Sequence, residues 1–160
     1  MRTSRHWRPP WGADARAEPT FQNLLQPNFK SFVRVAQALE NTGCGAYLGA
    51  APWILRQAYL AAAGSIALVE GRHAGWLNVY AGDRLATNIF GEAPAFERAL
   101  TVEEVLAAAG PFIADLNGGP PVGYALERSD ENDIAILNFA LALEYLEAEF
   151  YNINVPIFIK

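Results

Sequence analysis

The sequence predicts an all-α domain, and three observations support this fold class. Apolar residues recur with the 3.6-residue period of an α-helix over residues 28–48, 53–81 and 134–151. The sequence Thr-Val-Glu-Glu at residues 101–104 is a capping box, which marks the start of a further, short helix. No segment of strand length alternates apolar and polar residues, apart from residues 152–160.

Length and composition point to one domain with a substantial core. The chain has 160 residues, of which 52% are apolar and 18% are charged. Its net charge of −5 argues against nucleic acid or an anionic membrane as a partner. A single cysteine, Cys44, excludes an internal disulfide framework and a cysteine-based zinc site, and it fits a reducing compartment.

Residues 1–26 are expected to form a disordered or extended tail ahead of a helical domain at residues 27–151. The tail has arginines but no apolar core segment, so it does not resemble a signal peptide, which slightly favours an intracellular location. No apolar run reaches the length of about 18 residues that a transmembrane helix needs.

The helical segments can be justified in chain order. Gly43 and Gly45 weaken the first helix by about 1 kcal/mol each, and we expect them to allow close approach of a neighbouring helix. Pro52 suits the first turn of the second helix, whose many alanines are typical of an interior helix.

The rest of the chain alternates loops and helices. Residues 82–100 are predicted to be a long loop, residues 101–109 a short helix and residues 117–123 a turn-rich linker. An acidic run, Ser-Asp-Glu-Asn-Asp, precedes the last helix, where negative charge favours the positive end of the helix dipole. Residues 152–160 are expected to be an extended apolar tail that needs a cover.

Three glutamates occupy positions that the helical period assigns to the core: Glu40, Glu70 and Glu144. An isolated buried carboxylate costs several kcal/mol, and three together exceed the stability of many domains, which is roughly 5–15 kcal/mol. No lysine or arginine shares a stripe with its glutamate within one helical turn. We therefore expect a cation or solvent to neutralise these carboxylates.

His73 favours the cation, because it follows Glu70 by three residues and lies on the same helix face. Helical bundles that bind two iron or manganese ions use this Glu-x-x-His pair, with single glutamates from other helices. Carboxylates and imidazole suit iron or manganese, and no thiolate is present to favour zinc or copper(I). The alternative is that a Glu-x-x-His pair has arisen by chance.

A repeated spacing links two of the helices. Ala-Leu-Glu is followed by tyrosine seven residues after the glutamate at both Glu40/Tyr47 and Glu144/Tyr151. A tyrosine two turns from a ligand can hydrogen-bond a carboxylate, although both tyrosines can equally be core aromatics. The repeat favours Glu144 over its neighbour Glu147 as the ligand.

These segments resemble the ferritin-like domain of plant desiccation-related proteins and their bacterial, fungal and algal relatives. "DIAILNFALALEYLEAEFY" (133–151) resembles the first helix of that family, "LENTGCGAYLGAAPWI" (39–54) the third and "AAAGSIALVEGRHAG" (61–75) the fourth. "TVEEVLAAAGPFI" (101–113) is similar to the segment that closes those domains. The resemblance covers about two-thirds of the chain.

The resemblance implies a ferritin-like bundle that holds iron or manganese. It implies the metal ligands Glu40, Glu70, His73 and Glu144, with Tyr47, Glu147 and Tyr151 as near neighbours of the site. The segment like the first helix comes last, and the second helix, with its own Glu-x-x-His, has no counterpart. The expected fold is therefore an incomplete or permuted four-helix bundle with long loops and irregular termini.

Three explanations of this order stay open: a fragment or rearranged gene product, a homo-oligomer that completes the bundle, or a degenerate member without metal chemistry. Two functions follow. One is oxidation or peroxide chemistry at iron or manganese. The other is a stress- or desiccation-related helical protein that acts by packing or oligomerising. The shortage of histidines for a complete site favours the second, non-catalytic function.

Overall fold

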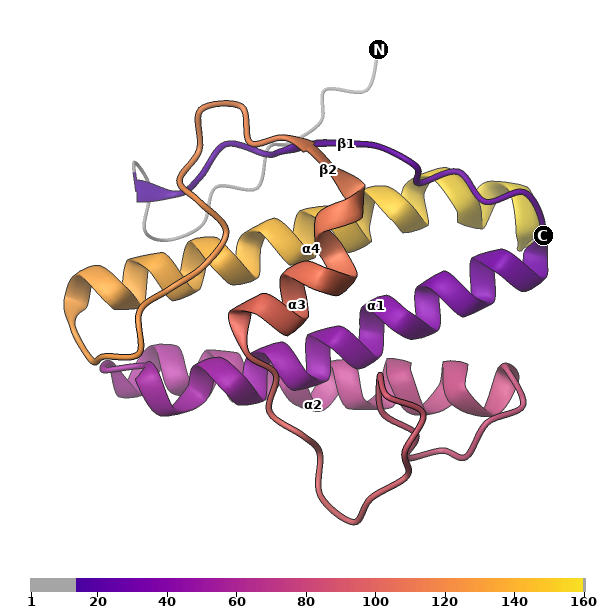
Figure 1. The fold of residues 1–160 in the computed structure, drawn as a ribbon, viewed down its shortest axis with the longest axis horizontal. Helices are drawn as coiled ribbons and strands as arrows, with labels where there is room; N and C mark the ends of the chain where they lie inside the picture. The colour runs from indigo at the N-terminus through magenta and orange to yellow at the C-terminus, as the bar shows by residue number, and fades with distance from the viewer. Residues whose placement is uncertain (1–13, 160) are drawn as a thin grey trace.

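Three long helices form the body of the protein, and the computed structural model describes residues 14–159 (Figure 1). Helix α1 runs antiparallel to both α2 and α4, and the short helix α3 packs against α1. Within the described residues, none of the helices is both long and apolar enough to cross a membrane. The elements are β1 (Thr20–Phe21), α1 (Phe29–Ala50), α2 (Gln57–Tyr80), α3 (Val102–Ala109), β2 (Ile113–Asp115) and α4 (Asp130–Phe158).

Helix α1 begins and ends close to the predicted positions. Asn28 caps it, because its side-chain oxygen accepts a hydrogen bond from the backbone N–H of Ser31 at 2.9 Å. The close neighbour at Gly45 is the loop before α3 rather than a helix: the backbone N–H of Leu100 donates to the Gly45 carbonyl at 2.9 Å. A side chain at Gly45 or Gly49 would collide with Leu100.

Helix α2 begins later than the sequence predicts. Pro52 lies in a 3₁₀ turn (Ala51–Trp53), and the helix starts only at Gln57. The reason lies in α4, where the carboxylate of Asp133 accepts the backbone N–H groups of Leu55 and Arg56 at 2.7 and 3.0 Å. This long-range contact holds the connection extended before the second helix begins.

The C-terminal segment, expected to be an extended tail, instead continues α4 to Phe158, and Pro156 lies within the last turns. Asn154 is fully buried, and its side chain accepts the backbone N–H of Gln26 and donates to the carbonyl of Leu24. Phe158 stacks against Phe32 of α1. These contacts supply the cover that the sequence required, so the prediction of an extended tail was wrong.

The N-terminal residues from 14 onward are extended but anchored. β1 pairs with β2 in a two-stranded antiparallel sheet that the sequence analysis did not predict. Asn138 of α4 binds the backbone of this segment, accepting the N–H of Arg16 at 2.6 Å and donating to the carbonyl of Asp14 at 2.9 Å. The first half of the expected tail, residues 1–13, lies outside the described residues.

The loop and the short helix agree with the sequence analysis. No helix forms between Tyr80 and Val102, and Gly82 and Gly91 in this loop have positive φ angles. Thr101 and Glu104 make both hydrogen bonds of the predicted capping box. The described residues therefore form an all-α domain with long connections, as predicted.

One side of the bundle is open. An apolar groove of about 600 Å³ lies between α2 and α4 and is lined mostly by alanine, leucine and isoleucine side chains. The outer face of α2 beside it is also apolar, and Arg72 is the only exposed residue of α2 that always carries a charge. The large apolar side chains exposed on this face are Leu68, Val69, Trp76, Val79 and Tyr80.

Candidate metal centre

Carboxylates from three helices converge between α1, α2 and α4. Glu40, Glu70 and His73 form one group, in which one candidate ligand atom per residue lies within 4.8 Å of the others. Glu70, Glu144 and Glu147 form a second group by the same measure. The fold thus brings together the four residues that the sequence singled out as ligands, and Glu70 lies in both groups.

Glu147 has a larger part in the cluster than the sequence analysis gave it. It was placed beside the ligands, whereas the structure puts its carboxylate with those of Glu70 and Glu144. The signal was present, because Glu144 and Glu147 are three residues apart on one helix face, the same spacing as Glu70 and His73.

His73 lies at the solvent edge of the cluster. Its Nδ1 is 3.0 Å from Oε2 of Glu40 and 3.9 Å from Oε2 of Glu70. The histidine side chain is 53% exposed, whereas the side chains of Glu40 and Glu70 are 3% and 6% exposed. The imidazole is therefore the part of this group that solvent reaches.

Two tyrosines connect α1 and α4 by crossed hydrogen bonds. The hydroxyl of Tyr47 on α1 donates to Oε1 of Glu144 on α4 at 2.6 Å. The hydroxyl of Tyr151 on α4 donates to Oε1 of Glu40 on α1 at 2.5 Å. Each tyrosine thus binds the glutamate of the opposite helix, so the repeated Glu–Tyr spacing gives an arrangement in which α1 and α4 are equivalent.

Burial and mutual repulsion disfavour negative charge in the cluster. Burial, a hydrogen bond with Glu40 and the charge of Glu147 raise the pKa of Glu70 to about 10. Burial and the charges of Glu40 and Glu144 raise the pKa of Glu147 well above its ordinary value. Among the described residues, no lysine or arginine forms an ion pair with any of these four carboxylates. Protons or a cation must therefore balance them.

One carboxylate oxygen marks where a cation would fit. Oε2 of Glu70 is buried, and no hydrogen-bond donor within residues 14–159 reaches it. Gly43 of α1 faces this oxygen, and a Cβ there would be in ordinary van der Waals contact with it at 3.5 Å and with Oε1 of Glu147 at 3.6 Å. Four carboxylates and one imidazole are a donor set that iron and manganese accept.

The donor set is nevertheless asymmetric. The first group contains an imidazole nitrogen, whereas the second consists only of carboxylates. A two-metal site of the bundle type has a Glu-x-x-His pair on each of two helices, and the described residues contain one such pair.

Comparison with known proteins places these residues in a recognised domain. A family model described as a ferritin-like domain matches residues 8–83 and 132–156, which together are more than half of the chain. The matched ranges contain all five residues of the cluster. No curated protein and no solved structure matches the chain.

Proposed function

Because the chain belongs to the ferritin-like domain family, we propose that its function is to bind iron or manganese between α1, α2 and α4. The observation that carries this proposal is the buried Oε2 atom of Glu70, which no hydrogen-bond donor among the described residues reaches; Glu70 itself belongs to both groups. The proposed ligands are Glu40, Glu70, His73, Glu144 and Glu147.

The charge of the carboxylate cluster supports a complete site that holds two divalent metal ions. Four ionised carboxylates carry four negative charges, which two divalent cations balance. Glu70 would contribute to both positions, because it belongs to both groups. Tyr47 and Tyr151 would hold the carboxylates of Glu144 and Glu40 in place through their short hydrogen bonds.

Iron or manganese held there would supply redox chemistry with dioxygen or peroxide. The chain's own groups determine how solvent and protons reach the site: His73 is open to solvent, while the side chains of Glu40 and Glu70 are buried. The single Glu-x-x-His pair among the described residues supports a second candidate function, that of a non-catalytic helical protein whose metal is structural or absent.

The test of metal binding is elemental analysis of the full chain, expressed with added iron or manganese and purified without chelator. We expect between one and two metal ions per chain, with less than half of that content in Glu70→Gln. Glu149→Gln is the matched control, because Glu149 is on α4 but outside both groups. A metal-free wild-type chain that also fails to bind Mn²⁺ at micromolar concentrations would overturn the proposal.

Turnover distinguishes the two candidate functions. The loaded wild-type chain and Glu70→Gln would be compared for consumption of hydrogen peroxide and of dioxygen. Consumption that depends on Glu70 supports oxidation chemistry, whereas loaded protein without turnover supports the non-catalytic function.

We further propose that a second copy of the chain closes the open side of the bundle. The apolar groove and the apolar face of α2 are adjacent on one copy, so a two-fold pair can place the face of each copy against the groove of the other. Depletion of charge on an exposed helix is typical of the core of a protein interface.

Sedimentation equilibrium tests this pairing. We expect the wild-type chain to be a dimer and Trp76→Glu to be a monomer, because Trp76 is 64% exposed on this face. Phe96→Glu is the control, since Phe96 is 86% exposed in the loop before α3 and should leave the dimer intact. A wild-type chain that remains monomeric at a concentration of about 1 mM would contradict stable pairing.

Two further proposals rest on the family resemblance. The helix order is permuted relative to the family, and the equivalence of α1 and α4 in the crossed tyrosine bonds supports treating them as corresponding helices. The protein serves in the response to stress or desiccation. Survival after drying, compared between bacterial cells that express the wild-type chain and cells that express Glu70→Gln, tests the second proposal.

A further inference from the structure

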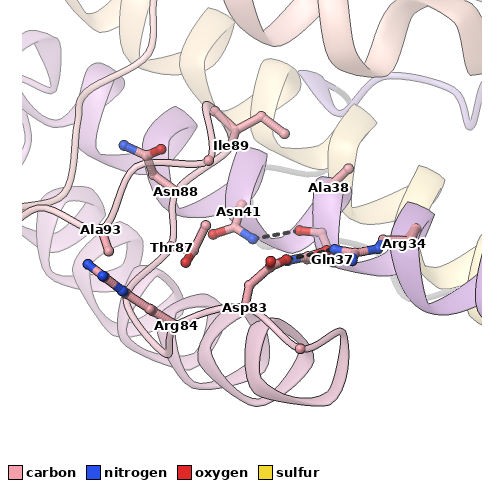
Figure 2. Close-up of a pocket in the computed structure, with 12 residues that line it drawn as sticks. Arg34, Gln37, Ala38, Asn41, Asp83, Arg84, Thr87, Asn88, Ile89 and Ala93 are labelled. Carbon is pink, nitrogen blue, oxygen red and sulfur yellow. Dashed lines mark hydrogen bonds and ion pairs between the residues drawn. The ribbon is translucent and has the colours of Figure 1, made fainter.

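A polar cavity lies between α1 and the loop after α2, and it shares no residue with the carboxylate cluster. Its volume is about 490 Å³, which is within the range of about 300–1,000 Å³ found for small-molecule sites. Figure 2 shows its lining side chains, which include Arg34, Gln37 and Asn41 from α1 and Asp83, Arg84 and Thr87 from the loop.

Buried amides hold the loop against α1 and so form the floor of this cavity. Gln37 and Asn41 are 8% and 4% exposed, although their helical stripe also carries charged residues. Both donate to Oδ1 of Asn78 on α2 at 2.9 Å. Asn78 in turn donates to the carbonyls of Leu85 and Thr87 in the loop, at 3.0 and 2.7 Å. The cavity is therefore formed before any ligand enters.

This network leaves several polar atoms at the cavity without a partner. Oδ1 of Asn41 accepts no hydrogen bond from the described residues, and neither does Oδ1 of Asp83. The hydroxyl of Thr87, a residue only 8% exposed, also forms no hydrogen bond within residues 14–159. These two acceptors and one hydroxyl belong to residues that line the cavity, so they are available to hydrogen-bond a polar ligand there.

The cavity also carries one excess positive charge. Arg34 is paired with Asp83, with 2.6 Å between Nη1 and Oδ2. The exposed guanidinium of Arg84 forms no ion pair or hydrogen bond with the described residues (Figure 2). A guanidinium presents paired donors that match the oxygens of a carboxylate or a phosphate.

We propose that this cavity binds a small polyhydroxylated molecule with one acidic group, a sugar acid or a sugar phosphate. The acidic group meets the guanidinium of Arg84. The hydroxyl groups donate to Oδ1 of Asn41 and Oδ1 of Asp83 and exchange hydrogen bonds with Thr87. A ligand with an ammonium group is disfavoured, because two guanidinium groups line the cavity and one carboxylate faces them.

Isothermal titration of the full chain in EDTA, at low ionic strength, tests the proposal independently of metal binding. The probes are D-gluconate, glucose 6-phosphate, neutral glucose and inorganic phosphate. We expect one of the two sugar anions to bind at least tenfold more tightly than either glucose or phosphate. Whichever anion binds identifies the acidic group as carboxylate or phosphate.

Two variants locate the binding. Arg84→Gln and Thr87→Val should each weaken binding at least tenfold, and neither removes a side chain of the amide network. Lys30→Gln is the control, because it makes the same charge change as Arg84→Gln at an exposed position of α1 outside the cavity. Circular dichroism of each variant verifies that the fold is intact.

Three results would overturn the proposal. The first is that neither sugar anion binds. The second is that inorganic phosphate binds as tightly as both sugar anions, which would indicate that the cavity attracts any anion. The third is that Lys30→Gln weakens binding as much as Arg84→Gln does, which indicates an effect of net charge rather than of this cavity.

Discussion

Replacing Glu70 by glutamine should have opposite effects on the metal-free and the metal-loaded protein. The side chain is enclosed, Oε2 has no donor within residues 14–159, and its pKa is raised to about 10. In the metal-free chain the carboxyl group must hold a proton or remain as an unpaired buried charge. Glutamine has nearly the same shape and carries no charge, so it removes this cost.

The size of the effect follows from the ordinary pKa of 4.5 for glutamate. A pH of about 7.5 lies about three units above this pKa, and keeping the carboxyl group protonated costs about 1.4 kcal/mol for each unit. The free-energy cost of the buried proton is therefore at most about 4 kcal/mol. Neighbouring Glu40 and Glu147 can share the proton, which lowers this figure, and we expect a gain of roughly 2 kcal/mol. For a chain of this size that gain raises Tm by roughly 4–8 °C.

Thermal unfolding followed by circular dichroism, in EDTA and in excess Mn²⁺, measures both effects. Glu70→Gln should raise Tm in EDTA, and in Mn²⁺ it should lose most of the stabilisation that binding gives the wild-type chain. Glu149→Gln should match the wild type in both conditions. A fall of Tm in Glu70→Gln that is equal in EDTA and in Mn²⁺ would refute a metal-binding role for Glu70, because the carboxylate would then be a purely structural hydrogen-bonding group.

Three further predictions follow from the same structure. Because the pKa values of Glu70 and Glu147 are raised, the folded chain holds more protons than the unfolded chain above pH 4.5. Urea unfolding in EDTA should therefore show stability falling as pH rises toward about 10, by up to about 1.4 kcal/mol per pH unit for each extra proton. Tyr47→Phe and Tyr151→Phe should each cost about 1–2 kcal/mol in urea unfolding, by similar amounts because their crossed bonds are equivalent. Gly49→Ala should cost about 3 kcal/mol by the same measurement, because its methyl group would meet the backbone of the loop before α3.

The glycine and tyrosine predictions each have a control within the chain. Gly64→Ala on α2 meets nothing within 4 Å and should gain about 1 kcal/mol. Tyr145→Phe, also on α4, removes a hydroxyl that makes no hydrogen bond with the described residues and should be nearly neutral. Stability that rises with pH in EDTA, unequal costs of the two tyrosine variants, or a neutral Gly49→Ala would each contradict the corresponding argument.

The parts of the fold that the sequence predicted are those with local causes. The capping box of Thr101 and Glu104 spans four residues, and its hydrogen bonds are all within that span. The end of α4 was mispredicted because Pro156 and its β-branched neighbours locally favour an extended chain. What keeps the segment helical is Asn154, which binds residues more than 120 positions earlier in the sequence.

In the candidate site, too, the sequence predicted the features with local causes and not those that depend on contacts between helices. Helical period alone placed Glu40, Glu70 and Glu144 on inward faces, because the period relates neighbours on one helix. It did not show that each tyrosine would bind the glutamate of the other helix, since that depends on how α1 and α4 pair. Nor did it show that Gln37, on a stripe with charged residues, would be buried beneath a loop.

The hydrogen bonds that hold the loop after α2 affect how fast a ligand can enter and leave the cavity. Amide hydrogen bonds hold this loop at Leu85 and Thr87, and the backbone of Leu100 fixes its far end to Gly45. Because Thr87 both lines the cavity and is held by one of these bonds, we expect this part of the loop to stay in place rather than to swing aside as a gate. Molecules would therefore enter and leave the cavity beneath it by diffusion through its mouth, with exchange rates set by solvent and charge rather than by a slow opening of the protein.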